Sequence, residues 1–485
     1  MKYSPVRNFI NGQWSVPSGS DSLQVESPLN GAIMSSVTMS TVADLEGAVK
    51  AAQAAQQLWA KVPIKERVQV FFRYKRLLEA NMKELSDLIR EENGKTWDEA
   101  KAEIEKAIEL TEFACAMPAL VSGELLEVSK GVECRIDRVP VGVVASIVPF
   151  NFPSMVPHWT IPNALVLGNA MIVKPSELVP LSCQRIATLL QEAGLPDGLF
   201  NTINGDKEMV NAICDHPGIQ TVTFVGSTRV AKLVYGRAAA NMKRVLALGG
   251  AKNHLIVLPD AHADMAGTNI AASMTGCAGQ RCMAASAMVA VGKSDHIIER
   301  LCEEARKIQP GVNLGSVITR QAKERIERYI TEAEAAGARI LVDGRKAVVP
   351  GAEGGYYVGP TVIDHVKPDM AIAREEVFGP VIAIMRTDTL EEAIRIENNN
   401  PYGNGASVFT QSGGLARQVA EQLSAGMVGV NIGVPVPREP FSFGGWNESK
   451  FGMGDITGKS SIDLWTRLKK TTVKWNPESR TNWMS

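Results

Sequence analysis

The sequence lacks the long apolar runs and the strong net charge that define several classes of protein. No stretch approaches the ~18–20 consecutive apolar residues that span a bilayer, and residues 1–6 carry no apolar core of a secretion signal. The net charge is −1, which creates no basic field for nucleic acid or an anionic membrane. We therefore expect no nucleic-acid partner, no membrane partner and a cytoplasmic location.

Cysteine and histidine are also scarce. The 7 cysteines are scattered, none forms a C-x-x-C pair, and the 6 histidines show no metal-ligand spacing. An odd number of scattered cysteines is typical of a reducing compartment. These absences predict free thiols and no metal site.

Length and pattern favour an α/β protein of two or three domains, because 485 residues exceed one simple core. Helices are expected at 41–59, 64–92 and 97–117. From residue 141, apolar strands alternate with helices, which predicts a doubly wound parallel sheet. A second α/β pattern begins near residue 251. The β-like segment from about 464 to 473 is expected to pair with a neighbouring strand, in this chain or in another subunit.

One thiol lies in a context that suggests catalysis. Cys282 ends the segment Gly279-Gln280-Arg281-Cys282, where a cation beside the thiol can stabilise a nucleophilic thiolate. The alternative for Cys282 is a buried structural thiol. For the nearby Cys277 we expect a packing role. Asn151 lies on a proline-flanked turn after the strand predicted at 143–148. It could donate to a developing oxyanion or only satisfy its own turn.

Other polar residues follow predicted strands, where doubly wound sheets bind ligands. Lys174 and Glu177 could hold ribose hydroxyls or form a surface ion pair. Gly226 and Ser227 begin a helix whose N–H groups suit a pyrophosphate, although the glycine pattern is weak. Glu376 and Phe378 could contact a nicotinamide ribose and its ring, or form an acidic turn.

Five motifs together resemble the aldehyde dehydrogenase superfamily: Phe150-Asn151-Phe152-Pro153, Lys174-Pro175-Ser176-Glu177, Phe224-Val225-Gly226-Ser227, Gly279-Gln280-Arg281-Cys282 and Glu375-Glu376-Val377-Phe378-Gly379-Pro380. The resemblance covers nearly the whole chain. It implies an α/β fold with two doubly wound parallel-sheet domains and a small β domain. The implied parts are an NAD-binding domain (1–120 and 140–248), a catalytic domain (249–463) and bridging or oligomerisation segments (121–139 and 464–485). A homo-oligomer, either dimer or tetramer, is implied as well.

The resemblance also implies the role of each site residue. Cys282 would attack the aldehyde, and the Asn151 side chain and the Cys282 N–H would stabilise the oxyanion. Hydride would pass to NAD, which the remaining motif residues would hold: Pro149, Phe150, Lys174, Ser176, Glu177, Gly226, Ser227, Glu376 and Phe378.

A missing carboxylate narrows the resemblance. Where hydrolytic members carry the glutamate that activates water, this chain has Leu248, and the segment 246–252 contains no acid. Gly250-Ala251-Lys252-Asn253-His254 and Pro435-Val436-Pro437 resemble the coenzyme A-acylating branch, methylmalonate-semialdehyde dehydrogenase. That branch implies NAD as cofactor, coenzyme A as co-substrate, and oxidation of malonate or methylmalonate semialdehyde with loss of carbon dioxide.

The expected substrate carries a carboxylate, for which two cations are candidates. Arg281 offers a bidentate donor beside the nucleophile. Lys106 stands where the branch is expected to carry a second arginine, and is a weaker partner. Two other functions stay open: a hydrolytic dehydrogenase with a substitute base such as Glu376, and a non-catalytic NAD-binding scaffold. The presence of Cys282 and Asn151 argues against the scaffold.

Overall fold

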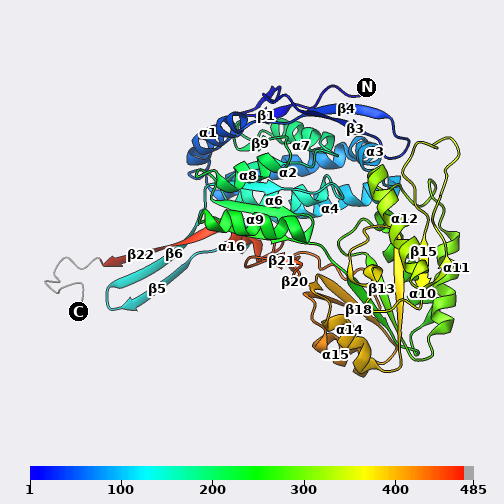
Figure 1. Ribbon diagram of the computed structural model, residues 1–485. Coiled ribbons are helices and arrows are strands. Elements are labelled where there is room, and N and C mark those ends of the chain that lie inside the picture. Colours follow the sequence, from blue (N-terminus) through cyan, green and yellow to red (C-terminus); the bar gives the residue numbers. More distant parts are fainter. Residues whose placement is uncertain (475–485) are drawn as a thin grey trace.

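The computed structural model describes residues 1–474. Two mainly parallel sheets, each covered by helices, form the body of the molecule, and a thin β arm projects from it (Figure 1). No helix in residues 1–474 is both long enough and apolar enough to cross a membrane. The α/β fold with two parallel-sheet units is as the sequence predicted.

The first sheet has the strand order β2-β1-β9-β8-β7-β10-β11-β21, with five parallel strands from β9 to β11. The short edge strands β1, β2 and β21 pair antiparallel. Every residue of β7 and β8 is buried, because helices cover both faces. The strands are β1 (Asn8–Ile10), β2 (Gln13–Ser15), β7 (Val143–Ile147), β8 (Ala170–Lys174), β9 (Phe200–Thr202), β10 (Thr221–Val225), β11 (Arg244–Leu248) and β21 (Lys450–Phe451).

Nine helices pack around this sheet or beside it in the described residues: α1 (Val42–Trp59), α2 (Ile64–Ala80), α3 (Met82–Asn93), α4 (Trp97–Cys115), α5 (Met117–Leu120), α6 (Met155–Val166), α7 (Leu181–Glu192), α8 (Lys207–Asp215) and α9 (Thr228–Ala240). The single helix expected at 64–92 is wrong, because Asn81 separates α2 from α3. Its side-chain amide donates to the Leu77 carbonyl (2.8 Å), which competes with the helical pattern.

The second sheet has the order β14-β15-β16-β13-β12-β18-β19, parallel except for β14. Ile256 of β12 packs into one apolar core and its neighbours Leu255 and Val257 into another, so both faces are covered. The strands are β12 (Asn253–Val257), β13 (Ala285–Val291), β14 (Arg339–Val342), β15 (Thr361–Asp364), β16 (Val381–Thr387), β18 (Gly405–Phe409) and β19 (Met427–Val430). The helices are α10 (Ala263–Thr275), the 3-10 turn η1 (Gly276–Gly279), α11 (Asp295–Lys307), α12 (Arg320–Ala335), α13 (Ala371–Arg374), α14 (Leu390–Asn398) and α15 (Gly413–Gln422).

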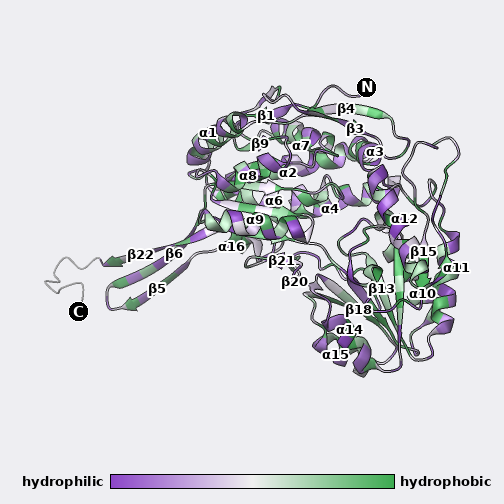
Figure 2. Ribbon diagram, viewed as in Figure 1, coloured by the Kyte–Doolittle hydropathy of each residue, from purple (hydrophilic) through white to green (hydrophobic). Residues whose placement is uncertain are grey.

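The arm is an antiparallel sheet of β5 (Glu124–Ser129), β6 (Val132–Pro140) and β22 (Thr466–Lys474). The predicted β segment at 464–473 is therefore a strand, and it pairs with β6 of the same chain. Adjacent Leu125 and Leu126 point to opposite faces and are each 66% exposed, so neither face is covered. Figure 2 shows the apolar residues that the arm presents. Residues 475–485 of the predicted bridging segment lie outside the described residues.

Segments from distant parts of the chain complete these units. β21 forms the edge of the first sheet, and α16 (Ser461–Trp465) buries Trp465 fully in the core beneath it. Two small sheets remain, β3 (Ser22–Glu26) with β4 (Ile33–Thr38), and β17 (Tyr402–Gly403) with β20 (Trp446–Asn447).

Candidate active site

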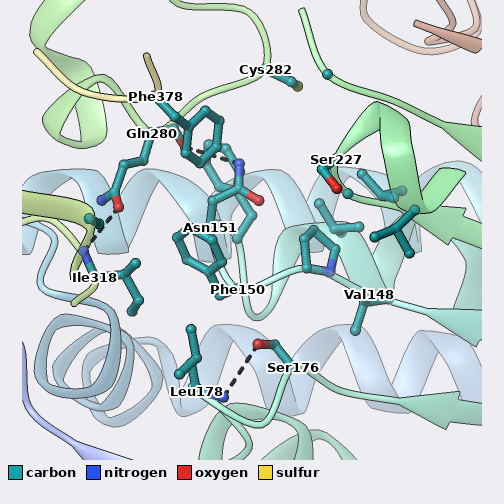
Figure 3. Close-up of a pocket in the computed structure, with 18 of the residues that line it drawn as sticks. Val148, Phe150, Asn151, Ser176, Leu178, Ser227, Gln280, Cys282, Ile318 and Phe378 are labelled. Carbon is teal, nitrogen blue, oxygen red and sulfur yellow. Dashed lines mark hydrogen bonds between the residues drawn. The ribbon is translucent and has the colours of Figure 1, made fainter. Parts of the chain in front are cut away.

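A cavity of about 920 Å³ opens between the two sheets. Its wall includes the residues at or just after the carboxyl ends of β7, β8, β10 and β11, where ligands bind in sheets of this kind. The opposite wall comes from the segment around Cys282, the start of α12 and the turn before β16. Figure 3 shows side chains from these walls facing one another.

The cavity brings together most of the residues that the sequence singled out. Those that line it are Pro149, Phe150, Asn151, Lys174, Ser176, Glu177, Gly226, Ser227, Cys282, Glu376 and Phe378. Lys106 and Arg281 do not line it. Their surroundings differ, and each is described below.

The backbone before Cys282 is strained. Cys277 and Ala278 have φ values of 52° and 53°, in the left-handed region that non-glycine residues rarely adopt. Gly279 follows with φ 69°, and a Cβ there would lie 2.0 Å from the Gly379 carbonyl oxygen. Gln280 then ties the segment to α12, because its Oε1 accepts from the Ile318 N–H (3.0 Å). The Gly-Gln pair thus fixes the approach of the chain to the thiol.

The thiol is not held as a thiolate in the free protein. Burial, and after it the Glu376 carboxylate, raises the pKa of Cys282 to about 12, and the opposing effect of the Arg281 charge is smaller. Arg281 instead donates to the carbonyls of Ala272 and Ser273 (3.0 and 2.8 Å) in the last turn of α10. The Arg281 charge therefore favours the thiolate only weakly, because the guanidinium caps a helix terminus.

Asn151 is held on the other wall by groups that the sequence analysis missed. Its Nδ2 donates to the Gln280 carbonyl (3.0 Å), which joins the two walls. The buried Lys95 donates to the Asn151 carbonyl (2.6 Å) and pairs with the buried Glu103 of α4. Glu103 in turn accepts from the N–H groups of Ser154 and Met155. The sequence signal that could have indicated this network is Glu103, a glutamate on the apolar face of a helix, where charge is rare.

Lys174, Ser176 and Glu177 form one corner of the cavity. Lys174 Nζ donates to the Glu177 carboxylate (3.0 Å). Ser176 Oγ accepts from the Leu178 N–H (3.3 Å), as Figure 3 shows. The Lys174–Glu177 ion pair is only partly exposed and lies on the cavity wall, so it differs from the surface ion pair that was the alternative.

Ser227 is the N-cap of α9, a 13-residue helix whose first N–H groups point to this wall of the cavity. No side-chain hydrogen bond caps that end in the described structure. A Cβ on Gly226 would lie 2.5 Å from the ring of Phe224. A glycine is therefore needed where the chain turns from β10 into α9.

Glu376 is half-buried beside Gly250, and its Oε1 accepts from the Ala251 N–H (3.1 Å). Burial raises the pKa of Glu376 to about 7. Nearby Lys252 is also buried, which lowers its pKa to about 7, and its Nζ has no hydrogen-bond partner among residues 1–474. Phe378 adopts φ 53° and meets the Phe150 ring edge-on, with 5.9 Å between centroids. The sequence analysis did not foresee Lys252.

Leu248 ends β11 and is 4% exposed, packed into the first core. The glycines that follow it, Gly249 and Gly250, line the cavity. The end of β11 therefore contributes the glycine backbone of residues 249 and 250 to the cavity, and no carboxylate. Glu376 is the acid whose charge acts on Cys282.

Lys106 lies on α4, one turn beyond Glu103 on the same helix face. Its Nζ donates to the carboxylates of Glu439 (2.6 Å) and Glu109 (3.0 Å). Glu439 comes from the segment that leads to Phe443, whose ring packs on Trp159 of the cavity wall (4.6 Å between centroids). Lys106 is thus near this wall but already paired.

Known proteins match the chain over nearly its whole length. The profile described as Aldehyde dehydrogenase family matches residues 14–471. Malonate-semialdehyde dehydrogenase 1 of Geobacillus thermodenitrificans is 43% identical over 97% of this chain and 99% of its own. The rat mitochondrial methylmalonate-semialdehyde/malonate-semialdehyde dehydrogenase [acylating] is 43% identical, over 98% and 90%. A solved structure, the putative methylmalonate-semialdehyde dehydrogenase of Sinorhizobium meliloti complexed with NAD, is 40% identical over 99% and 100%, with a TM-score of 0.97. The chain belongs to the aldehyde dehydrogenase family.

Proposed function

We propose that the protein oxidises malonate or methylmalonate semialdehyde with NAD and transfers the acyl group from Cys282 to coenzyme A. The observation that carries this proposal is a cysteine in the cavity wall with Leu248, and no carboxylate, at the end of β11. The relatives named for malonate and methylmalonate semialdehyde, at about 43% identity, support the choice of substrate.

The residues of the cavity fit NAD. The free N–H groups at the start of α9 suit a pyrophosphate, and the Lys174–Glu177 pair suits the hydroxyls of a ribose. Glu376 and Phe378 lie on the wall near Cys282, where the nicotinamide end would be held. NAD, when bound, supplies the hydride acceptor. Within this proposal, the first sheet is the NAD-binding part and the second carries the nucleophile.

Acylation begins with the thiol. The Cys282 Sγ attacks the aldehyde carbon to form a thiohemiacetal, and the thiol proton leaves to solvent or to a neighbouring base. The oxyanion forms beside the Asn151 amide and the Cys282 N–H. Asn151 is suited to this role because Lys95 and Gln280 fix it from two sides, and fixed donors cost no reorganisation in the transition state.

Deacylation is a thiol exchange. The coenzyme A thiolate attacks the thioester carbon, the bond to Cys282 Sγ breaks, and the thiol is regenerated. A thiolate is a strong nucleophile without a positioned base, whereas water requires one. Leu248 therefore selects against hydrolysis. Loss of the substrate carboxylate as carbon dioxide gives acetyl-CoA from malonate semialdehyde and propionyl-CoA from its methyl relative.

The substrate carboxylate is proposed to meet Lys106 and Arg281. In the free protein, Lys106 is paired with Glu439 and Arg281 with the end of α10. A bound carboxylate would therefore exchange with Glu439 on Lys106. The uncovered arm of β5, β6 and β22 supports a homo-oligomer, a dimer or a tetramer, as the assembled form.

A hydrolytic dehydrogenase is the second candidate, and Glu376 is the observation that favours it. This carboxyl lines the same cavity as Cys282 and has a pKa raised to about 7, which suits a general base near neutral pH. It would then replace the glutamate missing at position 248.

One assay separates the two candidates. Purified protein is mixed with NAD and malonate semialdehyde, with and without coenzyme A, while NADH and the acyl products are measured. We expect at most one equivalent of NADH per site without coenzyme A, and sustained turnover to acetyl-CoA with it. Equal steady rates in both mixtures, with free acid as product, would establish the hydrolytic enzyme. Cys282→Ala is the control and should give no NADH in either mixture.

A further inference from the structure

Two buried amides converge on the peptide of the nucleophile. The carbonyl oxygen of Cys282 accepts from Asn253 Nδ2 at 2.8 Å and from Asn404 Nδ2 at 2.9 Å. Both side chains belong to residues that are 5% exposed. Both lone pairs of one carbonyl are thus used by side chains from two separate segments.

Each amide also binds a second group near Cys282. Asn253 Nδ2 donates to the Ala284 carbonyl (3.0 Å), and its Oδ1 accepts from the Gly405 N–H (3.1 Å). Asn404 Nδ2 lies 3.0 Å from the Met283 sulfur. The two asparagines therefore join the start of β12, the nucleophile loop and the start of β18.

These anchors are themselves rigid. Asn253 begins β12 in the middle of the second sheet, between β13 and β18. The neighbouring Lys252 carbonyl accepts from Asn400 Nδ2 (2.7 Å), and His254 pairs with the buried Glu397 of α14. A polar network thus fixes the backbone on both sides of Asn253.

Cys282 needs such support because its own segment has little. It lies after the 3-10 turn η1 and before β13, outside any regular element, and the backbone before it is strained at Cys277 and Ala278. Gln280 fixes the segment two residues before the thiol. Without further contacts, the peptide that follows Cys282 could rotate and change the position of Sγ in the cavity.

We propose that Asn253 and Asn404 are positioning residues that clamp the Cys282 peptide and fix the place of its thiol in the cavity, an inference that builds on the proposed role of Cys282 as nucleophile. Loss of either amide leaves the buried Cys282 carbonyl with a single donor and loosens its peptide. The Asn404 amide also acts to lower the pKa of the Cys282 thiol, against the effect of burial. Loss of the Asn404 amide should therefore also lower the fraction of Cys282 that is present as thiolate at a given pH.

The test measures thiol reactivity, which does not depend on the aldehyde or on coenzyme A. Asn253→Asp and Asn404→Asp keep the side-chain shape but set a carboxylate against the carbonyl. The rate constant for alkylation of Cys282 by iodoacetamide is measured from pH 6 to pH 10, with mass spectrometry to confirm the site. We expect a fall of at least tenfold at pH 8 and a pH profile displaced upward.

Two further measurements separate positioning from misfolding. NAD affinity, followed by protein fluorescence, should stay within about twofold of the parent, and kcat with the semialdehyde should fall more than KM changes. Asn404→Leu, which removes the donor without adding charge, should slow alkylation in the same direction. Asn431→Asp is the matched control, because Asn431 donates to the Thr410 carbonyl (2.9 Å) away from the cavity.

Parental alkylation rates and pH profiles in Asn253→Asp and Asn404→Leu would overturn the proposal. Such a result would leave the proposed function intact, since that function is decided by the coenzyme A assay. If the parent protein does not turn over the semialdehyde but alkylation slows in the Asn253 and Asn404 variants as expected, the clamp is supported and the protein acts on another substrate.

Discussion

Leu248 ends β11 and directly precedes Gly249 and Gly250, which line the cavity. If the missing carboxylate selects coenzyme A over water, Leu248→Glu should raise the release of free acid relative to acyl-CoA by about tenfold or more, since general-base catalysis contributes about 10²–10⁴-fold. The product ratio is measured by chromatography at a fixed coenzyme A concentration.

Leu248→Gln is the matched control, because glutamine is as long as glutamate and also polar but cannot act as a base. It should leave the ratio near that of the parent. An unchanged ratio in Leu248→Glu, in a variant that still binds NAD, would remove the selective role assigned to the leucine.

At this scale, the sequence was a good guide to residues that carry their own motif. Asn151 and Lys174 could be placed on one cavity because the carboxyl ends of parallel strands meet at one edge of a sheet, whereas Cys282 and Glu376, which precede β13 and β16, were expected there from their motifs. It was a poor guide to side-chain direction. Arg281 is adjacent to the nucleophile in sequence, yet its guanidinium turns to α10, and sequence spacing in an irregular segment does not determine such a turn.

His158 on α6 provides a prediction at the scale of a helix contact. It is buried, its Nε2 lies 2.8 Å from the Tyr74 hydroxyl of α2, and burial lowers its pKa from 6.5 to about 4. Between these two values the unfolded chain binds a proton that the folded chain does not, so stability falls as the pH drops below about 6.5. The loss amounts to about 2 kcal/mol at pH 5.

This effect is measured as the difference in melting temperature between pH 7.5 and pH 5.0. His158→Gln can keep one hydrogen bond but cannot titrate, so its melting temperature should fall less over the same interval. Equal falls in both proteins would mean that His158 does not carry the pH dependence.

Element by element, the prediction succeeded where the pattern is local. The helices predicted at 41–59 and 97–117 match α1 and α4 to within two residues, because period and caps mark them. The break at Asn81 was missed, since the apolar period continues across it and only the backbone of this one residue, with φ −104° and ψ 15°, departs from the helix. The order of strands in each sheet follows from contacts between distant residues, which no local pattern encodes.

The arm supplies a prediction for the whole molecule. Leu125 and Leu126 are exposed on opposite faces, so a charge at either position should not disturb the core of its own chain. If the arm pairs with a second copy, Leu125→Glu with Leu126→Glu should convert the assembly to smaller species in light scattering, by burying charge at an apolar contact.

Far-ultraviolet circular dichroism should be unchanged in that double variant. Val348→Glu, another exposed aliphatic position at 70% exposure, is the control and should keep the parental mass. A parental mass in the Leu125 and Leu126 variant would place the subunit contact elsewhere.

The two-sheet plan was predictable at this largest scale because alternating strands and helices favour parallel sheets covered on both faces. The short segments that join the first sheet from a distant part of the chain were not predictable. β21 has two residues and α16 has five, so neither has enough length to show a period. Their place beside the first sheet depends on burial of Trp465 and on pairing with β11.

The burial of Trp465 also has a consequence for folding of the chain during its synthesis on the ribosome. The first sheet gains its last edge strand only when residue 451 has emerged, and its core is closed only by residue 465 of 485. At about 5–20 residues per second, translation reaches that point after on the order of a minute. Throughout that time the nascent chain exposes an unfilled apolar site beneath a sheet that is otherwise ready to fold. The first sheet therefore keeps part of its apolar core exposed until the segment that carries Trp465 has been made.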